Sequence, residues 1–154
     1  MVLIMNKKIM IINGPNLNML GYRNPVFYDN TPWKDYIFSI RSKFCNQIQI
    51  LDFQSNHEGD IIDKIQEIFF DKDYIGLIIN AGGYSHTSIA IHDALEILEI
   101  PIIEVHLSNI HQREEFRNYS YITELAKKCI IGKGLKGYEL GIQYLLDLKY
   151  GNKI

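Results

Sequence analysis

The chain has no long apolar run, little cysteine and no excess of positive charge. None of its apolar stretches approaches the ~20 residues that a helix needs to cross a bilayer, so we expect no membrane partner. Its 16 basic and 18 acidic residues give a formal net charge of -2, which provides no basic field to attract nucleic acid. A small polar ligand is therefore the favoured kind of partner.

The start of the sequence and its two cysteines favour a cytoplasmic location. Residues 1–8 place their lysines after a very short apolar stretch, which reverses the order found in a secretory signal peptide. Cys45 and Cys129 lack a metal-binding spacing, and two isolated thiols without an export signal indicate a reducing compartment. Met5 is an alternative to Met1 as the start codon.

The length and the spacing of apolar residues predict a single α/β domain over residues 1–154. A chain of 154 residues with 47% hydrophobic content can bury one core. Nearly continuous apolar runs predict buried parallel strands, and apolar residues at helical spacing predict the helices between them. The expected strands are 8–13, 48–53, 75–80, 102–106 and 129–132, and the expected helices are 33–44, 61–69, 88–98 and 138–148. This alternation favours a three-layer, flavodoxin-like sandwich with a five-stranded parallel sheet.

Polar, turn-forming segments follow three of the expected strands. They are residues 13–18, 80–87 and 104–109. Because the carboxyl ends of parallel strands lie along one edge of a sheet, we expect these amides, imidazoles and hydroxyls to converge in one crevice. The long connection 21–32 has no apolar periodicity and is expected to be a lid over that crevice.

His106 and Glu104 form the first candidate acid–base pair. They lie two residues apart on a strand, so their side chains point to the same face. A carboxylate beside an imidazole stabilises its protonated form, which suits a general acid. An ordinary buried hydrogen bond explains the pair equally well at this point.

A tyrosine and three arginines are candidates for the rest of the site. A free phenol has a pKa of ~10, so its use as a base near neutrality requires a nearby positive charge, which Arg23 could supply to Tyr28. Judged on these residues alone, an exposed tyrosine and a solvated arginine are the favoured alternative. Arg113 and Arg117 follow the fourth strand and could grip a carboxylate or hydroxyls, or could pair with neighbouring glutamates.

Two other patterns are better explained by structure than by function. Residues 132–137 match G-x-G-x-x-G, but a dinucleotide site needs a further strand and an acidic residue beyond it, so we expect a tight glycine turn. The histidines have no helical i, i+4 pair, so we expect no metal site. They are His57, His86, His92, His106 and His111.

Five segments together resemble the type II 3-dehydroquinate dehydratases. They are residues 13–18, 21–28, 53–59, 80–88 and 104–111, in the same order within residues 8–146. The resemblance implies a flavodoxin-like fold, no metal or cofactor, and a homododecamer built as a tetramer of trimers. It also implies the anti dehydration of 3-dehydroquinate to 3-dehydroshikimate through an enolate. This step belongs to the shikimate pathway of aromatic amino acid biosynthesis, and quinate breakdown uses it too.

The resemblance also implies roles for particular residues. Tyr28 is the base that removes a proton next to the ketone, and Arg23 keeps it ionised. Asn16 and a bound water stabilise the enolate, and His106, oriented by Glu104, protonates the departing hydroxyl. The remaining positions bind the substrate's carboxylate (Asn80, Leu107 and Ser108) or its ring hydroxyls (His86, Ser108 and Arg117), belong to the lid (Arg113), or reach in from a neighbouring subunit (Asp93).

The sequence departs from the family pattern at two places, and one rival class stays open. Asp29 stands where the family usually has glycine, and His92 stands where it usually has arginine. The rival is a non-catalytic flavodoxin-like module, either a ligand-binding domain or a receiver. A phospho-receiver needs an acidic cluster at the strand ends, whereas this chain has Asn13, Asn80 and His106 there.

Overall fold

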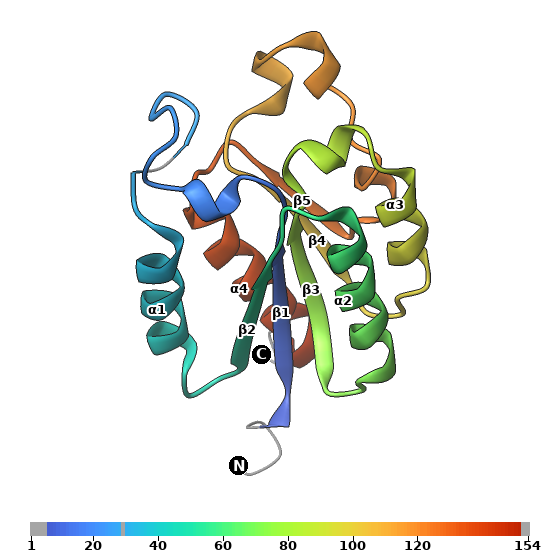
Figure 1. The fold of residues 1–154 in the computed structure, drawn as a ribbon. Coiled ribbons are helices and arrows are strands. Elements are labelled where there is room, and N and C mark those ends of the chain that lie inside the picture. The colour runs from blue at the N-terminus through green and yellow to red at the C-terminus, as the bar shows by residue number, and fades with distance from the viewer. Residues whose placement is uncertain (1–5, 29, 152–154) are drawn as a thin grey trace.

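A computed structural model describes residues 6–28 and 30–151, and within them one parallel sheet lies between two layers of helices (Figure 1). The strands are β1 (Lys8–Asn13), β2 (Gln49–Gln54), β3 (Tyr74–Asn80), β4 (Ile102–His106) and β5 (Lys128–Ile131). Their order in the sheet is β2-β1-β3-β4-β5, and every neighbouring pair is parallel. The predicted five-stranded, flavodoxin-like sandwich is thereby confirmed.

The helices cover the two faces of the sheet because the strands are apolar on both sides. The helices are α1 (Trp33–Phe44), α2 (Glu58–Phe70), α3 (Ile89–Glu96) and α4 (Lys136–Tyr150). Along β1, Ile9 and Ile11 pack with α1 and α4, whereas Met10 and Ile12 pack with α2 and α3. This alternation follows from the two-residue period of a strand. Among the described residues, no helix combines the length and the apolar character needed to cross a membrane.

The observed strands and helices occur in the expected order and differ from the expected ones in where they begin and end. The four helices were predicted in place, but α2 and α4 begin earlier, because polar residues can occupy a first helical turn. Helix α3 is shorter than residues 88–98, and Ser88 caps it by accepting a hydrogen bond from the Ile91 amide at 2.9 Å. Met1, Met5 and Asp29 lie outside the described residues.

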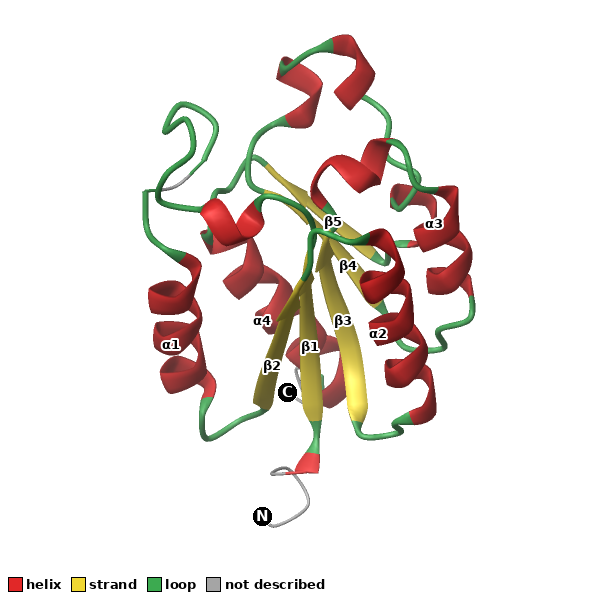
Figure 2. Cartoon of the chain, in the orientation of Figure 1, coloured by secondary structure: helices red, strands yellow, loops and turns green. Residues whose placement is uncertain are grey.

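Short 3-10 helices, which the apolar pattern did not predict, lie in the connections after β1, β3 and β4 (Figure 2). They span Leu17–Met19, Gly82–His86, Ile110–Gln112, Glu115–Arg117 and Thr123–Leu125. In Figure 2 the first four of these lie above the carboxyl ends of the strands, whereas Thr123–Leu125 lies beside α3, shortly before β5. Register places Asn13 beside both Gln54 and Asn80, so the polar segments after β1, β2 and β3 start at one level.

Candidate active site

One crevice at the carboxyl edge of the sheet gathers most of the side chains that the sequence singles out. Its volume is about 120 Å³, and residues from the segments after β1, β3 and β4 line it. Among the predicted site residues, only Glu104 and Asp93 do not line it. Those that do are Asn16, Arg23, Tyr28, Asn80, His86, His106, Leu107, Ser108, Arg113 and Arg117.

The floor of the crevice depends on a close approach between two backbone segments. The Gly14 amide donates to the Asn80 carbonyl at 2.7 Å, and a Cβ at position 14 would lie 2.2 Å from the Ala81 carbonyl oxygen. Only glycine fits there. Asn16 then adopts a left-handed conformation with φ of 69°, and its backbone N–H donates to Asn56 Oδ1 at 3.0 Å. The loop after β2 therefore holds the Asn16 turn in place.

The glycine turn at residues 132–137 supports the other wall. Gly132 and Gly134 have φ of +74° and +57°, a conformation that other residues rarely adopt. Their amides donate to the carbonyls of His106 and Leu107, each at 3.1 Å. These contacts account for the glycines by backbone geometry, in agreement with the tight turn that we predicted.

Two guanidinium groups contact the phenol oxygen of Tyr28. Arg23 donates to it through Nη2 at 2.9 Å, and Arg113 donates through Nη1 at 2.8 Å. The Arg23 guanidinium carbon also lies 3.7 Å from the centroid of the Tyr28 ring. The alternative of a solvated Arg23 is therefore wrong in this geometry. The contact from Arg113 was not predicted, because 85 residues separate it from Tyr28.

A buried carboxylate holds the imidazole of His106. Glu104 is fully buried, and its Oε1 lies 2.5 Å from His106 Nε2. The hydroxyls of Ser120 and Thr123 donate to the same carboxylate at 3.0–3.2 Å. Burial acts to raise the pKa of Glu104, but the hydrogen bond and charge of His106, with the two hydroxyls, outweigh burial and lower it. Glu104 is therefore ionised near neutrality and accepts the His106 N–H.

A second imidazole stacks beside the first. The rings of His86 and His106 lie 6.1 Å apart between centroids, at an interplanar angle of 23°. His86 Nδ1 lies 2.7 Å from the Tyr119 carbonyl oxygen, which can only accept, so this nitrogen carries the proton. Burial lowers the pKa of His86, which favours the neutral ring. In that form Nε2 is an acceptor, suited to a ligand hydroxyl.

The arginines after β4 approach a neighbouring glutamate, one of the two arrangements that the sequence left open, and they also line the crevice. Arg117 lines the crevice, and its Nε donates to Glu114 Oε2 at 2.9 Å. Arg113 also approaches Glu114, at 3.6 Å, while its Nη1 lies 3.4 Å from Ser108 Oγ. The glutamate positions both guanidinium groups and does not withdraw them from the crevice.

Asp93 lies on the exposed surface of α3, outside this crevice. Beside it, His92 Nδ1 lies 3.2 Å from Asp93 Oδ1, and His92 Nε2 lies 2.6 Å from Glu124 Oε1. The ligand atoms of His92, Asp93 and Glu96 lie within 4.8 Å of one another, a spacing that could hold a cation. The carboxylates on both ring nitrogens suit a protonated His92, which joins α3 to the segment before β5.

We expect His92 to make stability depend on pH. Its pKa is raised above the ordinary 6.5, first by the hydrogen bond to Asp93 and then by Glu124 and Glu96. The stabilising contribution is therefore full below pH 6.5 and is lost as pH rises through the raised, folded-state pKa. Urea unfolding of the wild type and His92→Gln measures the difference in unfolding free energy between them. We expect this difference to be larger at about pH 5.5 than at about pH 9. An equal difference in unfolding free energy at the two pH values would contradict it.

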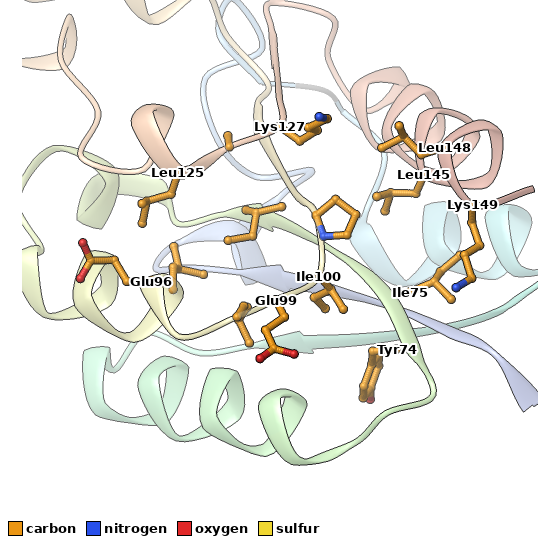
Figure 3. A pocket seen from close by; sticks show the side chains of 15 residues that line it. Tyr74, Ile75, Glu96, Glu99, Ile100, Leu125, Lys127, Leu145, Leu148 and Lys149 are labelled. Carbon is orange, nitrogen blue, oxygen red and sulfur yellow. The ribbon is translucent and has the colours of Figure 1, made fainter. Parts of the chain in front are cut away.

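A larger groove of about 720 Å³ lies at the opposite end of the sheet (Figure 3). Its walls come from the beginnings of β3 and β4, the end of α3, and α4. Figure 3 shows its charged side chains, among them Glu96, Glu99, Lys127 and Lys149, spread around an apolar floor. They do not converge on one point, and no histidine lines the groove. The smaller crevice is therefore the candidate active site, despite its size.

The fold and this crevice define a class: flavodoxin-like α/β proteins with an acid–base site at the carboxyl edge of a parallel sheet. One wall has a phenol between guanidinium groups, and a carboxylate-bound imidazole lines the same cavity. Such a pair can take a proton from one atom of a small polar ligand and give a proton to another.

Comparisons with known proteins identify the family. The model of the family "Dehydroquinase class II" matches residues 7–146, and the chain belongs to that family. The catabolic 3-dehydroquinase 2 of Neosartorya fischeri is 47% identical over 92% of this chain and 97% of its own. The 3-dehydroquinate dehydratase of Thermotoga petrophila is 45% identical over 90% and 94%. The crystal structure of a type II dehydroquinase from Butyrivibrio crossotus has a TM-score of 0.86 at 45% identity, covering 90% of this chain and 97% of that one.

Proposed function

We propose that this chain, acting as one catalytic domain, dehydrates 3-dehydroquinate to 3-dehydroshikimate in the shikimate pathway. Membership of the dehydroquinase family supports this reaction. The observation that carries it is the pairing, in one cavity, of the guanidinium-bound Tyr28 oxygen with the imidazole bound to Glu104. A non-catalytic module has no need of such a pair.

The first half of the proposed reaction is proton removal. In this proposal Tyr28 acts as the base in its phenolate form, and the positively charged groups of Arg23 and Arg113, which both donate to its oxygen, stabilise the negative charge there. The phenolate takes a proton from the carbon next to the ketone. Negative charge then develops on the ketone oxygen, where Asn16 and a water molecule stabilise the enolate.

The second half is loss of the hydroxyl group. His106, protonated and oriented by Glu104, gives its proton to the hydroxyl on the β-carbon, which leaves as water. The enolate electrons form the new carbon–carbon double bond, conjugated with the ketone. An anti elimination requires Tyr28 and His106 to act from opposite faces of the ring.

The remaining crevice residues bind the substrate in this proposal. Asn80 and the amides of Leu107 and Ser108 bind its carboxylate, and Arg117 and His86 bind ring hydroxyls. The neutral His86, with Nε2 as acceptor, suits a hydroxyl donor.

We also propose a cytoplasmic homododecamer, a tetramer of trimers, in which Asp93 reaches a neighbouring subunit's site. Light scattering would then give twelve times the 17.9 kDa of one chain.

A direct assay tests the proposed function. Purified protein is mixed with 3-dehydroquinate in the presence of a chelator, and the absorbance of the conjugated enone is followed. We expect turnover without added metal or cofactor. A protein that binds 3-dehydroquinate without forming the enone would support the ligand-binding module instead.

Arg23→Ala is expected to make the reaction need a higher pH. Without this guanidinium, the phenolate loses one of its two positive neighbours, so the acidic limb of the kcat/KM profile moves to higher pH. Activity at neutral pH should fall about tenfold or more. Arg41→Ala is the control, because Arg41 bonds to Ile50 and Asp52 outside the crevice. An unchanged profile for Arg23→Ala would count against phenolate stabilisation by this residue.

A further inference from the structure

A buried phenol beneath the crevice joins the ends of two strands. Tyr138 of α4 is fully buried, and its hydroxyl oxygen lies 2.6 Å from Asn13 Oδ1 and 3.0 Å from Asn80 Nδ2. Asn13 ends β1 and Asn80 ends β3. Tyr138 does not line the crevice, whereas Asn80 does. The three side chains therefore form a relay from the back of the sheet to the site.

The direction of each hydrogen bond in this relay is fixed by a backbone amide. The Gly82 N–H, which can only donate, lies 3.2 Å from the Asn80 amide oxygen, Oδ1. The Asn80 nitrogen must then face Tyr138 and donate to its oxygen. Because a phenol has one proton, that proton goes to Asn13, which must present its own oxygen. Burial raises the pKa of Tyr138, so the phenol stays protonated and the polarity does not change near neutrality.

These hydrogen-bond directions leave a buried donor of Asn13 without a partner. Asn13 is 1% exposed, and its Nδ2 has no hydrogen-bond partner among the residues that the structure describes. A buried donor without a partner is unfavourable, so the relay keeps the Asn13 oxygen on Tyr138 against a penalty. The consequence lies at Asn80. Its oxygen is used by Gly82 and one N–H by Tyr138, which leaves the second N–H to offer to a ligand.

We propose that Tyr138 is a positioning residue that sets the specificity of the crevice. The Gly82 N–H sets the orientation of the Asn80 amide, and Tyr138 holds the amide in it by accepting one of its N–H groups, so that the second N–H is presented as a donor. The crevice thereby selects an anionic acceptor, the carboxylate of the ligand. This inference rests on the proposed function, because it assigns a determinant of substrate binding to that site.

Tyr138→Phe tests the role with little change of shape. The ring packs against Trp33 at 4.8 Å and Tyr36 at 6.2 Å between centroids, and phenylalanine keeps these contacts. Loss of the hydroxyl removes one of the two hydrogen bonds that hold the Asn80 amide, so we expect KM for 3-dehydroquinate to rise about three- to tenfold with kcat within about twofold. The pH profile should not move, because Tyr28 and His106 keep their partners. Asn13→Ala, which removes the acceptor of the Tyr138 proton, should raise KM in the same way.

Tyr36→Phe is the matched control. It removes a hydroxyl from the same aromatic cluster, one that donates to the Leu135 carbonyl at 2.6 Å and lies outside the crevice lining. We expect its KM to equal that of the wild type. Equal KM values for Tyr138→Phe and the wild type would overturn the inference, as would an equal rise in both phenylalanine variants. Melting temperatures separate lost stability from lost binding.

Calorimetry with 3-dehydroshikimate provides a readout that does not need turnover. The dissociation constant should rise in Tyr138→Phe and Asn13→Ala but not in Tyr36→Phe, and an unchanged constant in the first two would overturn the inference. A wild type that fails to turn over 3-dehydroquinate would contradict the proposed function instead. The two failures are therefore distinguishable.

Discussion

Tyr28→Phe is expected to lower kcat by a factor on the order of 10² to 10⁴, with KM nearly unchanged. The variant loses only the oxygen that Arg23 and Arg113 contact, and with it the proposed proton acceptor. The ring keeps its edge-to-face contact with Phe27, at 6.4 Å between centroids. Steady-state kinetics measure the loss. Exchange of the α-proton of 3-dehydroquinate with deuterium from solvent should stop as well.

Tyr22→Phe is the control for this experiment. Tyr22 belongs to the same loop but is 81% exposed and does not line the crevice. We expect its kcat and KM to match those of the wild type. A near-normal rate in Tyr28→Phe would remove Tyr28 from the role of base, and the proposed mechanism with it.

His106→Gln is expected to lower kcat by a similar factor, on the order of 10² to 10⁴, because the leaving hydroxyl loses its proton donor. The amide nitrogen of glutamine can take the place of His106 Nε2, the atom that contacts Glu104, so the buried carboxylate keeps a donor. Proton removal by Tyr28 does not need the imidazole. We therefore expect solvent exchange of the α-proton to continue while loss of water is blocked.

The exchange experiment separates the two halves of the reaction. In a stepwise elimination, Tyr28→Phe blocks exchange and His106→Gln preserves it. Loss of exchange in both variants would contradict the assignment of His106 to the second step. Melting temperatures of the two variants establish whether the folded state is intact, since His106 lies in the sheet beside a buried charge.

The sheet and its helices were predictable because apolar spacing determines them. Ile9 and Ile11 pack with one helical layer and Met10 and Ile12 with the other, an alternation that a strand enforces. The 3-10 helices were not predictable in this way. Ile110–Gln112 forms where Asn109 accepts a hydrogen bond from the His111 amide at 3.1 Å, a local contact without apolar periodicity.

The residues that line the crevice were largely predictable, whereas those behind them were not. Motifs at the ends of parallel strands indicate what meets at one edge. The partners of those residues come from distant parts of the chain: Tyr138 lies 58 residues from Asn80 and 125 from Asn13, and Ser120 lies 16 from Glu104. Only the packing of α4 and of the segment before β5 brings them together. The roles assigned to the crevice residues stay predictions until the variants are measured.

The close approach of Gly14 to the Ala81 carbonyl has a practical consequence for protein engineering. Two stretches that are far apart in the chain have interlocking main chains, so neither can be redesigned alone. Any other residue at position 14 would place its Cβ 2.2 Å from the Ala81 carbonyl oxygen, so one of the two main chains would have to shift. Transplanting this pocket onto another scaffold requires moving residues 13–18 and 80–87 as one inseparable block.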